Sequence, residues 1–123
     1  MKIGRIYATA DGESHIELDI VLTASARRPL FYNSTRFATT ATGFQHVRAG
    51  GATAWHNPPQ RWLAFVLAGT WEIETSDGSR RQFAAGSVWL VEDTTGKGHR
   101  GWAVGNVEVL VASVSLALDA VIE

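Results

Sequence analysis

The stretch "ATAWHNPPQRWLAFVLAG", residues 52–69, places a histidine after a tryptophan and just before a proline pair, then becomes apolar and ends in glycine. Residues two apart on an extended chain face the same side, so His56 is expected to face the same way as Gln60 and Trp62. Proline cannot donate to a sheet ladder, which favours a sheet edge or the mouth of a barrel. Small ligands bind at such mouths. The stretch therefore predicts one wall of a small-molecule pocket.

Outward from this stretch, the chain consists of short apolar or alternating runs with turn signals between them, and almost nothing repeats at helical spacing. In "WEIET", Trp71, Ile73 and Thr75 share one face, as in a half-buried strand. "SDGS" is a hairpin turn of the Asp-Gly kind. The pattern predicts an all-β sandwich or barrel. Strands are expected near residues 3–8, 15–22, 44–49, 62–67, 71–75, 80–84, 87–92, 99–104 and 107–116.

Residues 24–43 differ from the rest because they are rich in Ser, Thr and Ala and have no sustained period. We expect a long connection without regular structure, packed over the barrel by Leu30, Phe31, Tyr32 and Phe37. A connection of this length is either functional, such as a lid, or irregular packing, and the sequence leaves both open.

The length, net charge and composition of the chain limit the class of protein. A chain of 123 residues is long enough for one core, so residues 1–123 are expected to form a single domain. The net charge is −1 with no basic cluster beyond two arginine pairs, which argues against nucleic-acid and anionic-membrane partners. The sequence has no cysteine, which excludes disulfides and thiolate metal sites. The start has no apolar leader, so a cytoplasmic location is expected.

Two segments resemble the two motifs of the cupin family. Gly50, His56 and Gly69 match the frame of the first motif over residues 50–69, and "GSVWLVEDTTGKGH" at 86–99 is similar to the second. The resemblance implies an all-β cupin domain, that is, a double-stranded β-helix or jelly-roll barrel. It also implies a homodimer joined through edge strands, which the N-terminal strands are suited to cover or exchange.

A closer resemblance is to a subset of small single-domain bacterial cupins. Its members carry "DGESH" near the start, "WHxxP" in the first motif and "EDTTGKGH" in the second. All three are present here, at 11–15, 55–59 and 92–99. The resemblance is specific for the fold but does not imply one activity, because cupins perform many unrelated functions.

In metal-binding cupins, two histidines and a glutamate of the first motif and a histidine of the second hold the ion. By position these four ligands correspond to His56, Pro58, Trp62 and His99. Proline and tryptophan side chains cannot ligate a metal, and catalytic zinc normally takes three protein ligands. Gln60 is one candidate for the third ligand. His46 is another, if its face of the preceding strand looks into the barrel.

Three functions remain open from the sequence. The first is a small-molecule enzyme with a degenerate site for a divalent ion (Zn, Fe, Mn or Ni), held by His56 and His99 with His46 or Gln60. The second is a lyase or isomerase without a metal, in which His56, His99 or Glu92 removes a proton from a carbon acid. The third is a non-catalytic domain that binds a small ligand.

The catalytic candidates are His56 and Glu92. Glu92 and Asp93 are adjacent, so only one of them can face the mouth of the barrel. The pocket is expected to be largely apolar, which suits an apolar or aromatic substrate. Its expected walls are Trp62, Trp89, Trp102 and Phe44.

Overall fold

Strands make up the regular structure of the protein in a computed structural model that describes residues 2–22, 24–28 and 31–122, with backbone alone at 24–28 and 32. No helix is present in these ranges, and therefore none that is long and apolar enough to cross a membrane. The strands are β1 (Lys2–Ala8), β2 (Ser14–Val21), β3 (Ala24–Arg28), β4 (Phe31–Ser34), β5 (Thr39–Val47), β6 (Trp62–Ala68), β7 (Thr70–Thr75), β8 (Arg80–Ala84), β9 (Val88–Val91), β10 (His99–Ala103) and β11 (Val109–Leu116).

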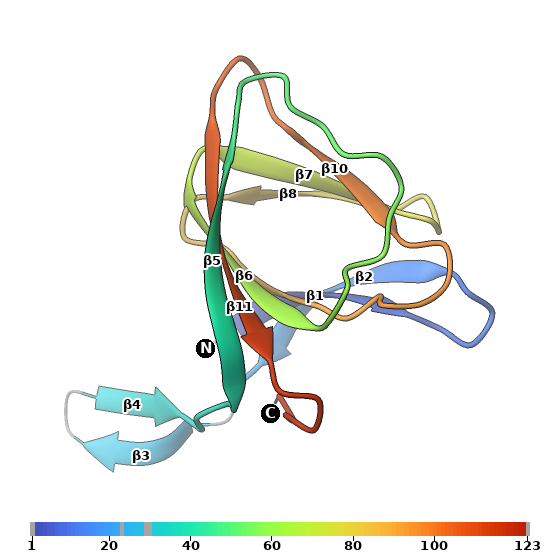
Figure 1. Cartoon of the computed structure of the whole chain (residues 1–123). Coiled ribbons are helices and arrows are strands. Elements are labelled where there is room, and N and C mark those ends of the chain that lie inside the picture. Colours follow the sequence, from blue (N-terminus) through green and yellow to red (C-terminus); the bar gives the residue numbers. More distant parts are fainter. Residues whose placement is uncertain (1, 23, 29–30, 123) are drawn as a thin grey trace.

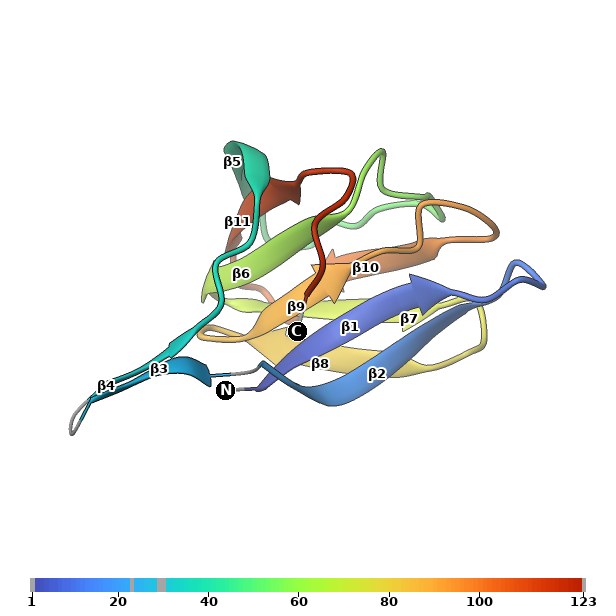
Figure 2. The ribbon, with the colours of Figure 1, turned by 90° about the horizontal axis from the view of Figure 1, so that it is seen from below.

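Nine of the described strands form two layers that face each other, and β3 and β4 form a separate two-stranded sheet (Figures 1 and 2). One layer is a six-stranded sheet in the order β2-β1-β9-β6-β11-β5, and the other is a three-stranded sheet in the order β10-β7-β8. Most neighbours pair antiparallel, whereas β1 and β9 run parallel. The arrangement is an all-β jelly roll, which confirms the predicted fold class.

The core lies between the two layers. Ile6, Val66 and Ile73 come from β1, β6 and β7, and they are almost fully buried in one cluster. Each such side chain contributes about 1.5–3 kcal/mol through the apolar surface it removes from water. A second cluster, which includes Leu63 and Leu90, covers the other face of the six-stranded sheet and packs against the C-terminal segment. Burial on both faces explains why "WLAFVLA" does not alternate with polar residues.

The nine strands expected from the sequence are all present, and their ends lie within two residues of the expected ones except where β5 begins. The prediction of an irregular connection over residues 24–43 is wrong. This segment contains the hairpin of β3 and β4, and β5 starts at Thr39. Pairing with β11 along its whole length makes β5 a strand. The local sequence does not contain that information.

The β3–β4 hairpin extends away from the two layers, as Figures 1 and 2 both show. Phe31 is exposed, so it does not pack over the barrel as expected. Phe37 is half-buried against the second cluster, as predicted. Leu30 and the side chain of Tyr32 lie outside the described part of the structure.

Two strands form the edges of the six-stranded sheet, β2 at one end and β5 at the other. An edge strand presents unpaired backbone groups that a second chain can pair with. The N-terminal hairpin thus supplies one edge and β5 supplies the other. Homodimer formation through an edge strand stays a prediction.

Gly101 on β10 allows Trp71 of the neighbouring strand to pack against the sheet. A Cβ at position 101 would lie 2.6–2.7 Å from atoms of the Trp71 indole, whereas a Cβ at Gly43 on β5 would meet nothing within 4 Å. We expect Gly101→Ala to lower the free energy of unfolding by about 1–3 kcal/mol through overpacking. Gly43→Ala is the matched control and should be neutral or stabilising by up to about 1 kcal/mol. Urea unfolding followed by tryptophan fluorescence measures both, and equal effects would contradict the packing role.

Candidate functional site

The centre of the candidate site is a pair of histidines that face each other across two chain segments. His56 and His99 form an antiparallel bridge in which each backbone N–H donates to the other residue's carbonyl, at 2.9 and 3.0 Å. Directly opposed residues in such a pair project their side chains to the same side. The two ring centroids are 4.7 Å apart. The two motifs of the sequence thus meet at one point.

The segment around His56 lies along the free edge of the smaller sheet. Thr53 donates its N–H to the carbonyl of Gly101 at 2.8 Å, and Ala52 bridges to Trp102. The segment therefore continues the three-stranded sheet beyond β10. The prediction that the proline-containing stretch occupies a sheet edge is confirmed.

One nitrogen of each ring has a fixed partner. His99 Nδ1 lies 2.7 Å from Asp93 Oδ2, and His56 Nδ1 lies 2.9 Å from the carbonyl oxygen of Ala54. A carboxylate or a carbonyl only accepts, so each Nδ1 carries a hydrogen, and Nε2 has a lone pair when the ring is neutral and a second hydrogen when the ring is protonated. Both side chains line the same cavity, and Nε2 is the ring atom left for a proton, a substrate or an ion.

Asp93 is the buried acid of the site. Its side chain is 0% exposed, and its second oxygen, Oδ1, has no hydrogen-bond partner among the described residues. Asn57 donates its side-chain amide to the carbonyl oxygen of Asp93 at 2.9 Å, which anchors the backbone next to the proline pair. A buried carboxylate needs compensation, and here the imidazole of His99 provides it.

The cavity has a volume of about 130 Å³ and lies between the two layers. His56 is exposed and His99 is buried, so the pair extends from solvent into the cavity. Most of the wall is apolar, and the few polar groups besides the histidines are Gln45, Thr53 and Ser113. The apolar lining consists of Val47, Trp62, Ala64, Trp71, Ile73, Trp89, Val91 and Val111.

Four of the residues named from the sequence come together in this cavity, namely His56, His99, Trp62 and Trp89. Gln60 does not line it, because its amide donates to Ser115 Oγ at 2.9 Å.

Phe44 and His46 point the other way along β5. Phe44 is 72% exposed, and His46 Nε2 lies 2.8 Å from Glu108 Oε2 on the surface. Val47 packs against the core cluster, which turns Gln45 and Val47 inward and Phe44 and His46 outward. Neither face of this strand is cleanly apolar, so the sequence alone leaves the choice open.

Glu92 lies on the other side of the six-stranded sheet. Its two oxygens bind Arg5 Nε at 2.6 Å and Arg61 Nε at 2.9 Å, and it does not line the cavity. Adjacent residues of an extended segment face opposite sides, so Asp93 takes the inner position. The prediction that Glu92 is the carboxylate of the site is therefore wrong, and Asp93 is the acid that contacts His99.

The wall residues that were not predicted from the sequence include Trp71 and Gln45. The signal for Trp71 was present, because "WEIET" places it on the same face as the buried Ile73. Gln45 alternates with His46, and no local feature distinguishes the inner face of that strand from the outer one.

The donor set around the two histidines falls short of a metal site. Each ring has Nδ1 fixed by an oxygen acceptor, as ligating histidines do, and the rings are close enough to share an ion. The remaining polar groups of the cavity are an amide and two hydroxyls, which are weak ligands for Zn²⁺ or Fe²⁺. Within the described ranges, no three His, Cys, Asp or Glu side chains group so that they could hold a metal ion. The residues around the two histidines therefore do not fit a metal ion.

Comparison with known proteins identifies the fold. A cupin domain from Bordetella pertussis superposes with a TM-score of 0.50 at 15% identity, covering 79% of this chain and 92% of that chain. The CENP-C cupin domain of Drosophila melanogaster gives 0.52 at 12% identity, covering 89% and 70%. The Cnp3 cupin domain of Schizosaccharomyces pombe gives 0.52 at 11% identity, covering 95% and 83%.

The chain therefore has the cupin fold, as the two sequence motifs predicted. No family model matches the sequence, and no curated protein matches it either. At these identities the solved structures show the fold alone. Any indication of function therefore has to come from the geometry and chemistry of the site.

Trp102 lies on the outer face of β10, away from the cavity. Arg100 stands over its ring at 5.9 Å and over that of Trp55 at 4.9 Å, within the range of cation–π contacts. Glu74 accepts hydrogen bonds from Arg100 at 2.7 Å and from Arg80 at 3.4 Å. The hydrogen bond from Arg100 is the largest cause that lowers the pKa of Glu74 below its ordinary value of 4.5.

A lowered pKa makes this contact dependent on pH. The contribution of Glu74 to stability is present above about pH 4.5 and is lost as the pH falls through its lower pKa in the folded state. We expect Glu74→Gln to make the free energy of unfolding less dependent on pH in this acid range. Denaturant titrations at a series of acid pH values measure the change, with Glu108→Gln, which alters an exposed glutamate that does not contact Arg100, as the comparison. An unchanged acid limb in Glu74→Gln would contradict the assignment.

Proposed function

We propose that this protein is an acid–base enzyme without a metal that removes a proton from a carbon next to a carbonyl group in a small, largely apolar substrate. His99 is the general base, Asp93 orients it, and His56 is the general acid. The reaction class is that of an isomerase or a lyase. The observation that carries the proposal is the 2.7 Å contact between the buried Asp93 carboxylate and His99 Nδ1.

The Asp93–His99 pair has the properties of a general base. The carboxylate fixes the tautomer in which Nε2 bears a lone pair, and it stabilises the imidazolium that forms when Nε2 takes a proton. Because Asp93 is 0% exposed, water does not screen this interaction. Asp93 itself does not touch the substrate, so it is a positioning residue.

The second histidine allows a proton to be returned to the substrate. His99 Nε2 accepts the proton from the α-carbon, and the electron pair of the broken C–H bond moves onto the carbonyl oxygen as an enolate. The enolate then returns its electron pair to carbon. In a β,γ-unsaturated carbonyl compound the double bond shifts to the α,β position and the γ-carbon takes a proton from protonated His56, which completes an isomerisation. In a compound with an oxygen substituent on the β-carbon, an α,β double bond forms, the C–O bond breaks and the departing oxygen takes the proton from His56, which completes an elimination. Afterwards His99 is protonated and His56 neutral, and exchange with water restores the pair. Ring centroids 4.7 Å apart put both groups beside one small molecule.

The cavity supports a small and mostly apolar substrate. Its volume of about 130 Å³ is below the roughly 300–1,000 Å³ typical of sites for drug-sized ligands. Three indole rings, from Trp62, Trp71 and Trp89, give flat apolar walls. Ser113 and Gln45 are the hydrogen-bonding groups on the β11–β5 side that suit a carbonyl oxygen.

The proposal is tested by hydrogen–deuterium exchange at carbon. We expect the protein, purified without a histidine tag and kept in EDTA, to catalyse exchange of α-hydrogens in D₂O for at least one member of a panel of small apolar carbonyl compounds. His99→Gln should slow the exchange by about 10²–10⁴-fold, since general-base catalysis contributes that much. Asp93→Asn should slow it as well. His46→Gln, which changes a histidine outside the cavity, is the matched control and should leave the rate unchanged. Proton NMR of the substrates follows the exchange.

Three outcomes would contradict the proposal. Exchange that EDTA abolishes and one divalent metal restores would identify a metal enzyme. Binding of panel compounds with no exchange of any of them would favour a ligand-binding domain. An equal rate in the protein and in His99→Gln would remove His99 as the base.

A further inference from the structure

We infer that Ser14 is a positioning residue that holds the loop between Asp93 and His99 in its active geometry. Ser14 belongs to a polar clasp, which we define as the β1–β2 turn (9–15), the β7–β8 turn (75–79) and the tip of the β9–β10 loop (96–98). The inference rests on the function proposed above, in which this loop carries the general base His99 and Asp93, the residue that orients it. The clasp contains the "DGESH" segment, which the candidate site leaves unexplained.

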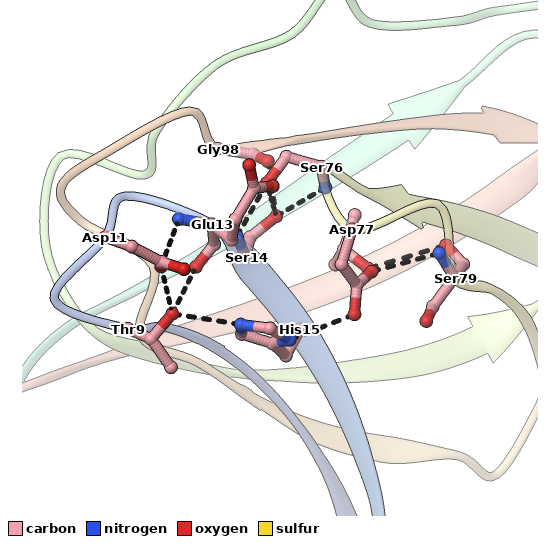
Figure 3. Close-up of polar contacts among 10 residues, drawn as sticks. Thr9, Asp11, Glu13, Ser14, His15, Ser76, Asp77, Ser79 and Gly98 are labelled. Carbon is pink, nitrogen blue, oxygen red and sulfur yellow. Dashed lines mark hydrogen bonds and ion pairs between the residues drawn. The ribbon is translucent and has the colours of Figure 1, made fainter.

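Ser14 is fully buried, with 0% of its surface exposed, although it lies at the start of an edge strand. Its hydroxyl donates to the carbonyl oxygen of Gly98 at 2.5 Å. Its backbone N–H donates to Ser76 Oγ at 2.6 Å, and the N–H of Ser76 donates to Ser14 Oγ at 2.7 Å. Figure 3 shows this reciprocal pair, with Gly98 above it. One hydroxyl thus joins three segments that are far apart in the sequence.

Gly98 is held between Ser14 and the segment that carries His56. Its φ is +74°, in the left-handed region that favours glycine, and a Cβ there would lie 2.0 Å from the carbonyl oxygen of His56. The next residue is His99, whose backbone pairs with His56. The carbonyl that Ser14 binds is therefore one peptide away from the general base.

A second set of contacts fixes the loop one residue earlier. Lys97 donates its backbone N–H to the carbonyl of Gly12 at 2.8 Å, and its ammonium group binds Glu13. Ser76 Oγ donates to the other oxygen of Glu13 at 2.8 Å. Gly96 packs so closely on Gly12 that a Cβ would lie 2.5 Å from the Gly12 carbonyl oxygen. The β1–β2 turn therefore contacts the tip of the loop through backbone groups as well as side chains.

The outer part of the clasp keeps the two turns in shape. His15 Nδ1 lies 3.0 Å from Asp77 Oδ2, and His15 Nε2 lies 3.0 Å from Thr9 Oγ1 (Figure 3). Asp77 also accepts hydrogen bonds from Thr75 Oγ1 at 2.7 Å and from the N–H of Ser79 at 3.0 Å. These contacts tie the β1–β2 turn to the β7–β8 turn on either side of Ser14.

The loop from Asp93 to His99 is thus anchored at both ends. Asn57 holds the carbonyl of Asp93, and Ser14 holds the carbonyl of Gly98. A hydrogen bond between a carboxylate and an imidazole depends steeply on distance and angle, so the tautomer of His99 depends on these anchors. Without the Ser14 hydroxyl, the Gly98 carbonyl would lose its partner from the clasp, and we expect the peptide that precedes His99 to shift relative to Asp93.

The test reads the His99 ring directly and needs no substrate. In two-bond ¹H–¹⁵N NMR spectra above the titration range of histidine, we expect His99 of the unaltered protein to show one tautomer, protonated at Nδ1. In Ser14→Ala we expect this single-tautomer signature to be lost, with a second set of ring ¹⁵N signals protonated at Nε2. His46, which lies outside the clasp and the cavity, serves as the internal reference.

Two further variants keep the result interpretable. Ser115→Ala is the matched control, since it removes the hydroxyl of another buried serine, which accepts a hydrogen bond from Gln60, and it should leave the His99 signals unchanged. Ser14→Cys retains the side-chain volume with a weaker donor, so it takes the place of Ser14→Ala if that variant does not fold. A folded Ser14 variant with an unaltered His99 spectrum would overturn the inference. Because this result does not depend on turnover, it is distinguishable from a failure of the exchange test.

Discussion

The two backbone hydrogen bonds between His56 and His99 are the constraint on which the candidate site depends. They fix two residues from opposite halves of the chain as direct neighbours, with both rings on the inner side. Both sheets support this contact. The smaller sheet supplies β10, which begins at His99, and the larger sheet supplies the cavity wall from β5, β6, β9 and β11. The chemistry of the site then follows from which atoms face the rings.

The buried Asp93 decides how the pair can act. A carboxylate at His99 Nδ1 and a carbonyl at His56 Nδ1 both leave Nε2 as the ring nitrogen without a protein partner among the described residues. A histidine with its Nδ1 fixed in this way can act as a metal ligand or as a general base. The other polar side chains of the cavity discriminate between the two roles. Around these rings they are an amide and two hydroxyls in an otherwise apolar wall, which favours proton transfer.

The loop that joins Asp93 to His99 illustrates how a short segment obtains a fixed shape without secondary structure. It crosses from one sheet to the other, and each of its ends binds a different element through one carbonyl group. Two glycines let it pass within van der Waals distance of the β1–β2 turn and of His56. Segments that look like separate motifs in the sequence thus meet as a single packed unit.

The sequence by itself determined the all-β class and the position of nearly every strand, because alternation and turn residues are local signals. The resemblance of two segments to the cupin motifs led to His56 and His99, and the cavity contains both of them together with two of the predicted tryptophans, Trp62 and Trp89. Only the tertiary structure decided the rest. The face of β5 that looks inward depends on Val47 reaching the core, so Gln45 lines the cavity and His46 does not. Glu92 was the predicted catalytic carboxylate, but the fold pairs it with two arginines and places its neighbour Asp93 against His99. Likewise, β5 extends to Thr39 because β11 pairs with it, and pairing between distant strands leaves no trace in a local pattern.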